Sequence, residues 1–256
     1  MKKETTFLAV PWGESMAKLK RAVSCLLAAV MLLGMCMLVP AASAAETADG
    51  LVYEETEEGI IITGYVGVGG DVVIPEEINS KAVIGIQKYA FRVSEVPAAD
   101  NITSIVIPDS VTSIAGTGLF RGCSQLRSVT FPENAVIDST ASMFRDCTAL
   151  ESITIPKSCT EIGNAMFQNC ISLIEVLFPD GITILLIGLL AFQKTAISEF
   201  DSPETLTSIG SQAFDSCSNL TDITIYDKVD SISIDAFNNI PKEQLTIHGI
   251  AGSYAN

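Results

Sequence analysis

LESITIPKSCTEIGNAMFQNCIS, residues 150–172, sets the pattern for the rest of the chain. It opens with apolar residues at alternate positions, and this alternation ends at Pro156. Such alternation is typical of a half-buried strand, and Pro ends a strand because it has no N–H to donate. A polar turn, an Ile-Gly pair, Phe167 and Cys170 then complete the unit. The stretch therefore predicts one strand followed by a compact return.

This unit recurs about every 23 residues from Ile102 onward. The strand part recurs as ITSIVIP, LRSVTFP, LESITIP, LIEVLFP, ISEFDSP and LTDITIY, at 102–108, 126–132, 150–156, 173–179, 197–203 and 220–226. The phenylalanine of the return recurs at Phe120, Phe144, Phe167, Phe192, Phe214 and Phe237. A unit this short cannot bury its own apolar face, but stacking aligns equivalent residues into continuous ladders. The sequence predicts an α/β solenoid of about six to seven coils, with short parallel strands on one side and short helical turns on the other.

Units such as LESITIPKSCTEIGNAMFQNC resemble the BspA-type leucine-rich repeats of bacterial surface proteins. The pattern of that family, roughly L-x-x-I-x-I-P-x-x-[VL]-x-x-I-x-x-x-A-F-x-x-C, is matched over residues 59–250. The resemblance implies a leucine-rich-repeat solenoid in a secreted or surface-exposed protein. It also implies a role in adhesion, or in binding host or bacterial surface proteins, with glycans as a further class of partner.

Residues 1–44 have the order of a cleaved secretory signal peptide. A basic stretch at 18–21 precedes an apolar run at 22–39, and small residues follow up to a cleavage site after Ala44. An apolar run of this length is near the lower limit for a membrane-spanning helix, so an anchor is the alternative. Helix-breaking Pro40 and the small residues after it favour cleavage.

The regions next to the regular repeats depart from the pattern. Residues 45–58 are acidic and are predicted to form a lead-in, loose at its start, to a single solenoid domain over 59–256. Within that domain, 59–101 is predicted as a cap-like repeat with an extra hairpin, and 245–256 as an incomplete C-terminal cap. Terminal repeats are expected to be atypical because they close the exposed ends of the core. The two strands of the extra hairpin are expected at 59–65 and 72–75.

Charge excludes several classes of partner. The chain has 15 Lys and Arg against 30 Asp and Glu, which gives a net charge of -15. Nucleic acid and anionic membrane surfaces are not expected partners, because the basic footprint that binds them is missing. Repulsion between acidic surfaces keeps proteins soluble and separate. We therefore expect a monomer that does not insert into a membrane after signal cleavage.

Four cysteines share one repeat position, and two interpretations of them are open. Parallel strands lie about 4.8 Å apart, which places thiols on adjacent coils within reach of a disulfide or a shared metal. The simpler interpretation is a ladder of buried thiols, since free Cys packs as a small hydrophobe. We favour the buried ladder, place Cys159 in the core as well, and predict no metal or other cofactor. The four cysteines are Cys123, Cys147, Cys170 and Cys217.

No set of catalytic residues is predicted. His248 is the single histidine, so Ser-His-Asp chemistry would depend on it alone. The glycine-rich stretch 67–70 lacks the Lys and the Ser or Thr that follow in a phosphate loop, so it is interpreted as a turn. The chain is therefore predicted not to be an enzyme.

The outward positions of the predicted strands remain after the core is assigned. They are rich in hydroxyl groups in the first half of the series and acidic in the second. A sheet of parallel strands offers an extended, rigid surface suited to recognising a protein or glycan, although solvated strand faces also favour such residues. We predict a secreted or cell-surface binding module that acts in adhesion, with a structural spacer in a larger surface assembly as the alternative. The predicted partner-binding residues are Ser128, Thr130, Ser152, Thr154, Glu175, Leu177, Glu199, Asp201, Asp222 and Thr224.

Overall fold

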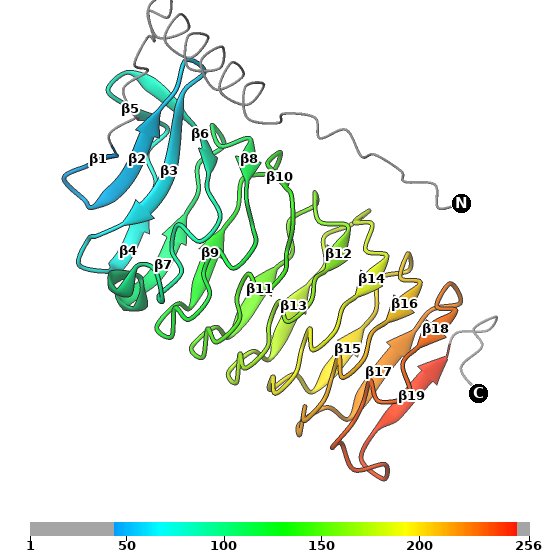
Figure 1. Ribbon diagram of the computed structural model, residues 1–256. Helices are drawn as coiled ribbons and strands as arrows, with labels where there is room; N and C mark the ends of the chain where they lie inside the picture. Colours follow the sequence, from blue (N-terminus) through cyan, green and yellow to red (C-terminus); the bar gives the residue numbers. More distant parts are fainter. Residues whose placement is uncertain (1–43, 250–256) are drawn as a thin grey trace, which may run out of the picture. The chain divides into compact units, whose positions relative to one another are not determined.

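The computed structural model describes residues 44–249, and these form a β-solenoid (Figure 1). The predicted signal peptide, apart from Ala44 at its end, lies outside the described residues, as does the chain after 249. Within the described range, no helix is long and apolar enough to cross a membrane.

Each coil contributes strands to two parallel ladders, which lie on different sides of the solenoid (Figure 1). The first ladder contains β4 (Gly70–Val73), β7 (Ile102–Val106), β9 (Ser128–Thr130), β11 (Ser152–Thr154), β13 (Glu175–Leu177), β15 (Glu199–Asp201), β17 (Asp222–Ile225) and β19 (Thr246–Gly249). The second contains β3 (Ile60–Tyr65), β6 (Lys81–Ile86), β8 (Ser113–Ile114), β10 (Val136–Ile137), β12 (Glu161–Ile162), β14 (Leu186–Ile187), β16 (Ser208–Ile209) and β18 (Ser231–Ile232). The solenoid thus has about eight turns of about 24 residues, against the six to seven coils predicted from the sequence.

The short helical turns expected opposite the strands were a wrong prediction. The described residues contain one 3-10 helix, η1 (Pro97–Asn101), and no α-helix. Ala165 and Asn169 have φ angles of 53° and 63°, and a left-handed residue at every fourth position divides a helix into separate turns. Alternate N–H groups then point to the next coil, as where Phe167 N–H donates to Ala191 O at 2.8 Å. This side of the solenoid is therefore a stack of consecutive turns joined by backbone hydrogen bonds.

The glycine of the Ile-Gly pair is required by the close approach of neighbouring coils. A Cβ atom on Gly163 would lie 2.6 Å from Thr140 Oγ1, and one on Gly188 would lie 2.5 Å from Asn164 Oδ1. Ile162, directly before the glycine, is fully buried in the second ladder. The pair therefore places one side chain in the core and then lets the next turn stack without a clash.

The second ladder is interrupted once, between β10 and β12. Thr140 bridges the two coils at this point. Its Oγ1 accepts a hydrogen bond from Gly163 N–H at 2.8 Å and donates one to Glu161 O at 3.2 Å. A side chain thus replaces part of the missing strand pairing.

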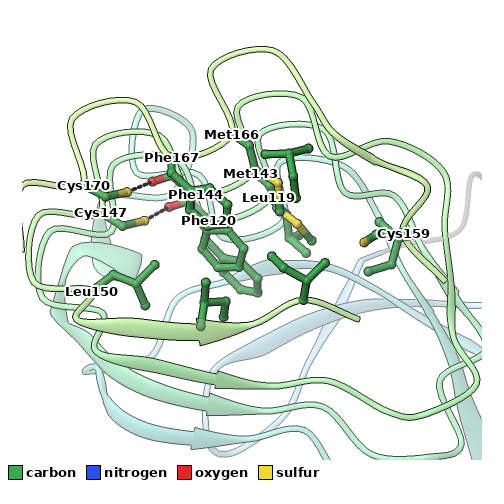
Figure 2. Packing of buried hydrophobic residues seen from close by; sticks show 14 of the residues in the cluster. Leu119, Phe120, Met143, Phe144, Cys147, Leu150, Cys159, Met166, Phe167 and Cys170 are labelled. Carbon is green, nitrogen blue, oxygen red and sulfur yellow. Dashed lines mark hydrogen bonds between the residues drawn. The ribbon is translucent and has the colours of Figure 1, made fainter. Parts of the chain in front are cut away.

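The recurring phenylalanines form one continuous stack in the core, as the repeat predicts. The rings from Phe91 to Phe214 are fully buried. Successive rings, continued to Phe237, stack with centroids 5.2 to 5.6 Å apart. Figure 2 shows Phe120, Phe144 and Phe167 in this stack. The predicted core is confirmed.

The first turns differ from the predicted arrangement. In the expected lead-in, β2 (Leu51–Glu55) pairs antiparallel with β3 and with β1 (Ala45–Glu46), and it buries Leu51 and Tyr53. No hairpin joins the strands expected at 59–65 and 72–75, because β3 pairs with β6 while β4 pairs with β7 in the other ladder. A short antiparallel pair between β5 (Glu77–Ile78) and β6 is also present. Antiparallel β2 therefore covers the first coil, and residues 51–55 belong to the folded unit.

Candidate binding face

The strand face, defined as the outward side chains of β4, β7, β9, β11, β13, β15, β17 and β19, carries all ten predicted partner-binding residues. Eight are exposed, and Asp222 and Thr224 are half-buried. The parallel register places them side by side in three groups. β9 holds Ser128 and Thr130; β11 and β13 pair Ser152 with Glu175 and Thr154 with Leu177; β15 and β17 pair Glu199 with Asp222 and Asp201 with Thr224.

The face also includes Asp71, which is not among the residues predicted from the sequence. Asp71 lies beside Ser104 in the register of β4 and β7. Its Oδ1 accepts hydrogen bonds from Ser104 Oγ at 2.7 Å and Thr103 Oγ1 at 3.0 Å. These two hydrogen bonds, chiefly the one from Ser104, lower the pKa of Asp71. The signal was present in VVIP, residues 72–75, which ends in Pro like the other units but was assigned to a hairpin.

At the other end of the face, His248 joins the predicted site. It lies on β19 beside Thr224, and its Nε2 is 3.1 Å from Asp222 Oδ1. The hydrogen bond with His248, followed by one from Thr221, lowers the pKa of Asp222. The residue considered as a catalytic candidate from the sequence is thus the hydrogen-bond partner of a strand-face carboxylate.

The ladder beneath the strand face is interrupted twice, between β9 and β11 and between β13 and β15. Where the strands of two successive coils pair, the residue directly after the first strand donates its N–H to a carbonyl oxygen of the next coil. Examples are Ile107 N–H to Thr130 O at 3.0 Å and Ile155 N–H to Leu177 O at 2.9 Å. Within residues 44–249, Phe131 and Phe178 at the equivalent position make no such bond. Both interruptions therefore follow a coil that has Phe directly after its strand.

Size explains why these two steps are open. Phe131 packs edge-on against Phe144 with ring centroids 6.3 Å apart, and Phe178 packs against Phe200 in the same way at 5.9 Å. Both Phe131 and Phe178 are only half-buried. Parallel strands pair at a spacing of about 4.8 Å, and a side chain too large for its place shifts the backbone. Phe131 and Phe178 are larger than the Ile found at this position in other coils, and we infer that their rings keep the next strand too distant to pair.

A groove opens at each interruption. The larger, with a volume of about 970 Å³, lies between β13 and β15 and contains the predicted residues Glu175, Leu177, Glu199 and Asp201. The smaller, about 520 Å³, lies between β9 and β11 and contains Thr130 and Thr154. We call the larger one the acidic groove. It is lined by the carboxylates Glu175, Asp180, Glu199, Asp201 and Glu204, the apolar residues Ile174, Val176, Leu177 and Phe178, and also Ser202 and Tyr226.

The sequence matches the family model for the BspA type leucine rich repeat region in six copies, over residues 84–188 and 185–253. The chain belongs to the BspA-type leucine-rich repeat family. The resemblance read from its repeats is thereby confirmed. No curated protein matches the sequence.

Two solved structures with this BspA-type chain's fold come from bacteria. A leucine rich cell surface protein from Faecalibacterium prausnitzii A2-165 is 21% identical, with 81% of this chain and 76% of that one covered and a TM-score of 0.51. The pneumococcal vaccine antigen PcpA is 15% identical, with 83% of this chain and 65% of that one covered and a TM-score of 0.58. At these identities the likeness shows a shared fold.

The recurring cysteines of this BspA-type solenoid lie in the core and away from the strand face. Each of the four thiols is fully buried and donates to the backbone carbonyl of a phenylalanine in the preceding coil, at 3.0 to 3.1 Å. Figure 2 shows two of these bonds, from Cys147 and Cys170. Burial raises the pKa of Cys217 to about 11 and that of Cys159 to about 12. The prediction of buried core thiols is confirmed, and Thr195 takes the same place in the coil between those of Cys170 and Cys217.

Proposed function

We propose that this protein is a secreted, non-catalytic binding module of the bacterial cell surface, which recognises a protein partner through its strand face and acts in adhesion. The strand face is the observation that supports the proposal. Its residues are ordered on paired strands, yet they lie outside the stacked core that gives the fold its stability. Their chemistry is therefore free to serve recognition.

The chemistry of the face favours a partner with cationic groups. Glu175, Glu199, Asp201 and Asp222 lie on three neighbouring strands, and the protein as a whole is acidic. Electrostatic complementarity speeds association and suppresses wrong partners. The hydroxyl groups of β9 and β11 add hydrogen-bonding positions suited to a protein surface or a glycan.

The structural neighbours and the N-terminal sequence both support the proposed location at the cell surface. The structural neighbour from Faecalibacterium prausnitzii is described as a cell surface protein, and the resemblance to BspA-type repeats implies the same location. The apolar run at 22–39 and the small residues before Ala45 support export. Once exported, a rigid sheet face held out from the cell would meet host or bacterial surface proteins.

The test is a binding screen of the purified protein against extracellular matrix proteins and surface glycans by biolayer interferometry. A face variant carrying Glu175→Lys, Glu199→Lys and Asp222→Lys is compared with a control variant carrying Glu57→Lys, Glu58→Lys and Glu77→Lys. The control makes the same change in net charge at exposed positions near the first coil. Melting temperatures of both variants show that they remain folded.

We expect a partner whose affinity falls at least about tenfold in the face variant and stays within about twofold in the control. Equal binding by wild type and face variant would refute recognition through this face. A protein that binds nothing in the screen would instead favour the structural spacer.

A further inference from the structure

The acidic groove, like the smaller one, has unpaired strands on both sides, and it differs from the smaller groove in its charge. We propose that it binds an extended peptide segment of a partner, with basic side chains at alternate positions. This inference rests on the proposed binding function and names its ligand class.

Backbone groups at the groove lack the pairing found elsewhere in the ladder. In a parallel ladder, alternate residues direct their N–H and C=O to opposite neighbours. Leu177 is engaged on β11, since its O accepts Ile155 N–H at 2.9 Å. The backbone of Val176 therefore faces β15, with which β13 does not pair. An open strand edge of this kind is a template for an added peptide.

The floor of the groove is apolar and partly open to solvent. Leu177 is 46% exposed and Ile174 is 59% exposed, and Phe178 beside them is half-buried. An exposed cluster of large apolar side chains, surrounded by polar residues, marks an interaction site. In an extended peptide, side chains alternate between two directions. Apolar residues would thus reach the floor while the others meet the walls.

The walls are acidic and carry no compensating charge. Five carboxylates line the groove and no Lys, Arg or His does, and none of the five forms an ion pair within residues 44–249. No cluster of three or more ligating side chains in that range could hold a metal ion, so the carboxylates suit separate cationic side chains. The smaller groove is different, since Glu133 and Lys157 balance each other there. Charge complementarity therefore selects a basic segment for the acidic groove alone.

A buried hydroxyl in the lining of the acidic groove also has no hydrogen-bond partner. Ser202, in the lining of the groove, is 3% exposed, and its Oγ has no hydrogen-bond partner. Leaving a buried polar group unsatisfied destabilises the fold, so such groups are uncommon in folded proteins. Other coils have Ile or Phe at this position. Ser202 is thus the one polar residue at this repeat position, and a bound peptide would bring backbone donors and acceptors close to it.

The experiment uses a fluorescein-labelled short peptide of alternating Lys and Val, with alternating Glu and Val as the reference, and follows binding by fluorescence anisotropy. A groove variant carries Glu175→Gln, Glu199→Gln and Asp201→Asn. Its matched control carries Glu57→Gln, Glu58→Gln and Glu77→Gln, which removes the same charge far along the chain. We expect the wild type to bind only the Lys-Val peptide, the groove variant to bind it about tenfold more weakly, and the control to match the wild type within about twofold.

Equal weakening in groove variant and control would overturn the proposal, because the attraction would then be general. Absence of wild-type binding to the Lys-Val peptide would overturn it as well. If a partner from the matrix screen binds the groove variant as tightly as the wild type, the groove assignment fails and the binding function stands. If the Lys-Val peptide binds as expected but the screen yields no partner, the groove is supported and the adhesive role fails.

Discussion

Raising the pH from about 8 to about 10 should destabilise the solenoid through its buried thiols. Cys123, Cys147, Cys159, Cys170 and Cys217 are all buried, and burial is the first cause of the raised pKa of each one. In the unfolded chain these thiols ionise near their ordinary pKa of 9.0. The folded state then holds protons that the unfolded state releases. The stability is fully present below about pH 9 and is lost as the pH rises toward the folded-state pKa, about 11 for Cys217.

The magnitude follows from the number of thiols. A thiol that stays protonated in the folded state and ionises with a pKa near 9 in the unfolded state costs about 1.4 kcal/mol at pH 10. Five such thiols together cost about 7 kcal/mol. Domain stabilities are about 5–15 kcal/mol, so the effect is large enough to lower the stability of the protein severely.

The assay is urea unfolding followed by circular dichroism at pH 8, 9 and 10 with a reductant present. The matched variant carries Cys147→Thr and Cys170→Thr. Thr195 shows that a hydroxyl is accepted at this position, where it is buried and donates to Phe192 O at 2.9 Å. Because Thr does not ionise, the variant should lose about 3 kcal/mol less than the wild type between pH 8 and pH 10.

Parallel loss of stability in wild type and variant would contradict this reasoning, because repulsion among other titrating groups would then be the cause. A free energy of unfolding that does not change between pH 8 and pH 10 would contradict the burial of protonated thiols itself.

Three further predictions follow from the core, the turns and the strand face. Phe167→Ala should cost about 3–5 kcal/mol, because it removes one ring from the continuous stack, and an unchanged melting temperature would contradict the core assignment. Lys194→Gly should stabilise the protein by about 1 kcal/mol, because exposed Lys194 has a φ of 59° that glycine adopts without strain. Glycine already occupies the equivalent position in an earlier coil, at Gly122. A lower urea midpoint for the variant would count against this. His248→Ala should raise the pKa of Asp222, because the hydrogen bond that lowers it is lost; an NMR pH titration of the Asp222 side chain that shows no shift would argue against this contact.

The repeat was readable from sequence because its determinants are local and periodic. The alternation around Ile153 and the buried rings of Phe144 and Phe167 each recur in almost every unit, so agreement between copies fixed the strands, the core and the family. The same periodicity placed the strand-face residues correctly in register within each group.

Three features escaped the sequence for physical reasons. Two-residue strands such as Glu161–Ile162 are too short to show alternation. The left-handed backbone at Ala165 and Asn169 is set by stacking against the next coil, since neither residue type announces it as glycine would. The interruptions depend on contacts between coils, although the cue was present in VTFP and VLFP, where Phe replaces the Ile of ITIP. The acidic groove followed from that replacement and so was not predicted.

The interrupted ladders also bear on how the molecule would respond to mechanical force. Between the coil of β9 and β10 and the coil of β11 and β12, both ladders are open. The joint is held by turn hydrogen bonds such as Phe144 N–H to Met166 O at 2.9 Å, and by the Thr140 bridge. Stability in a solenoid is a sum of nearest-neighbour interfaces, so tension applied along the axis would part the weakest interface first. A molecule tethered to a cell and pulled by flow would yield at this joint and lengthen there, while the blocks on either side, including the acidic groove, kept their shape.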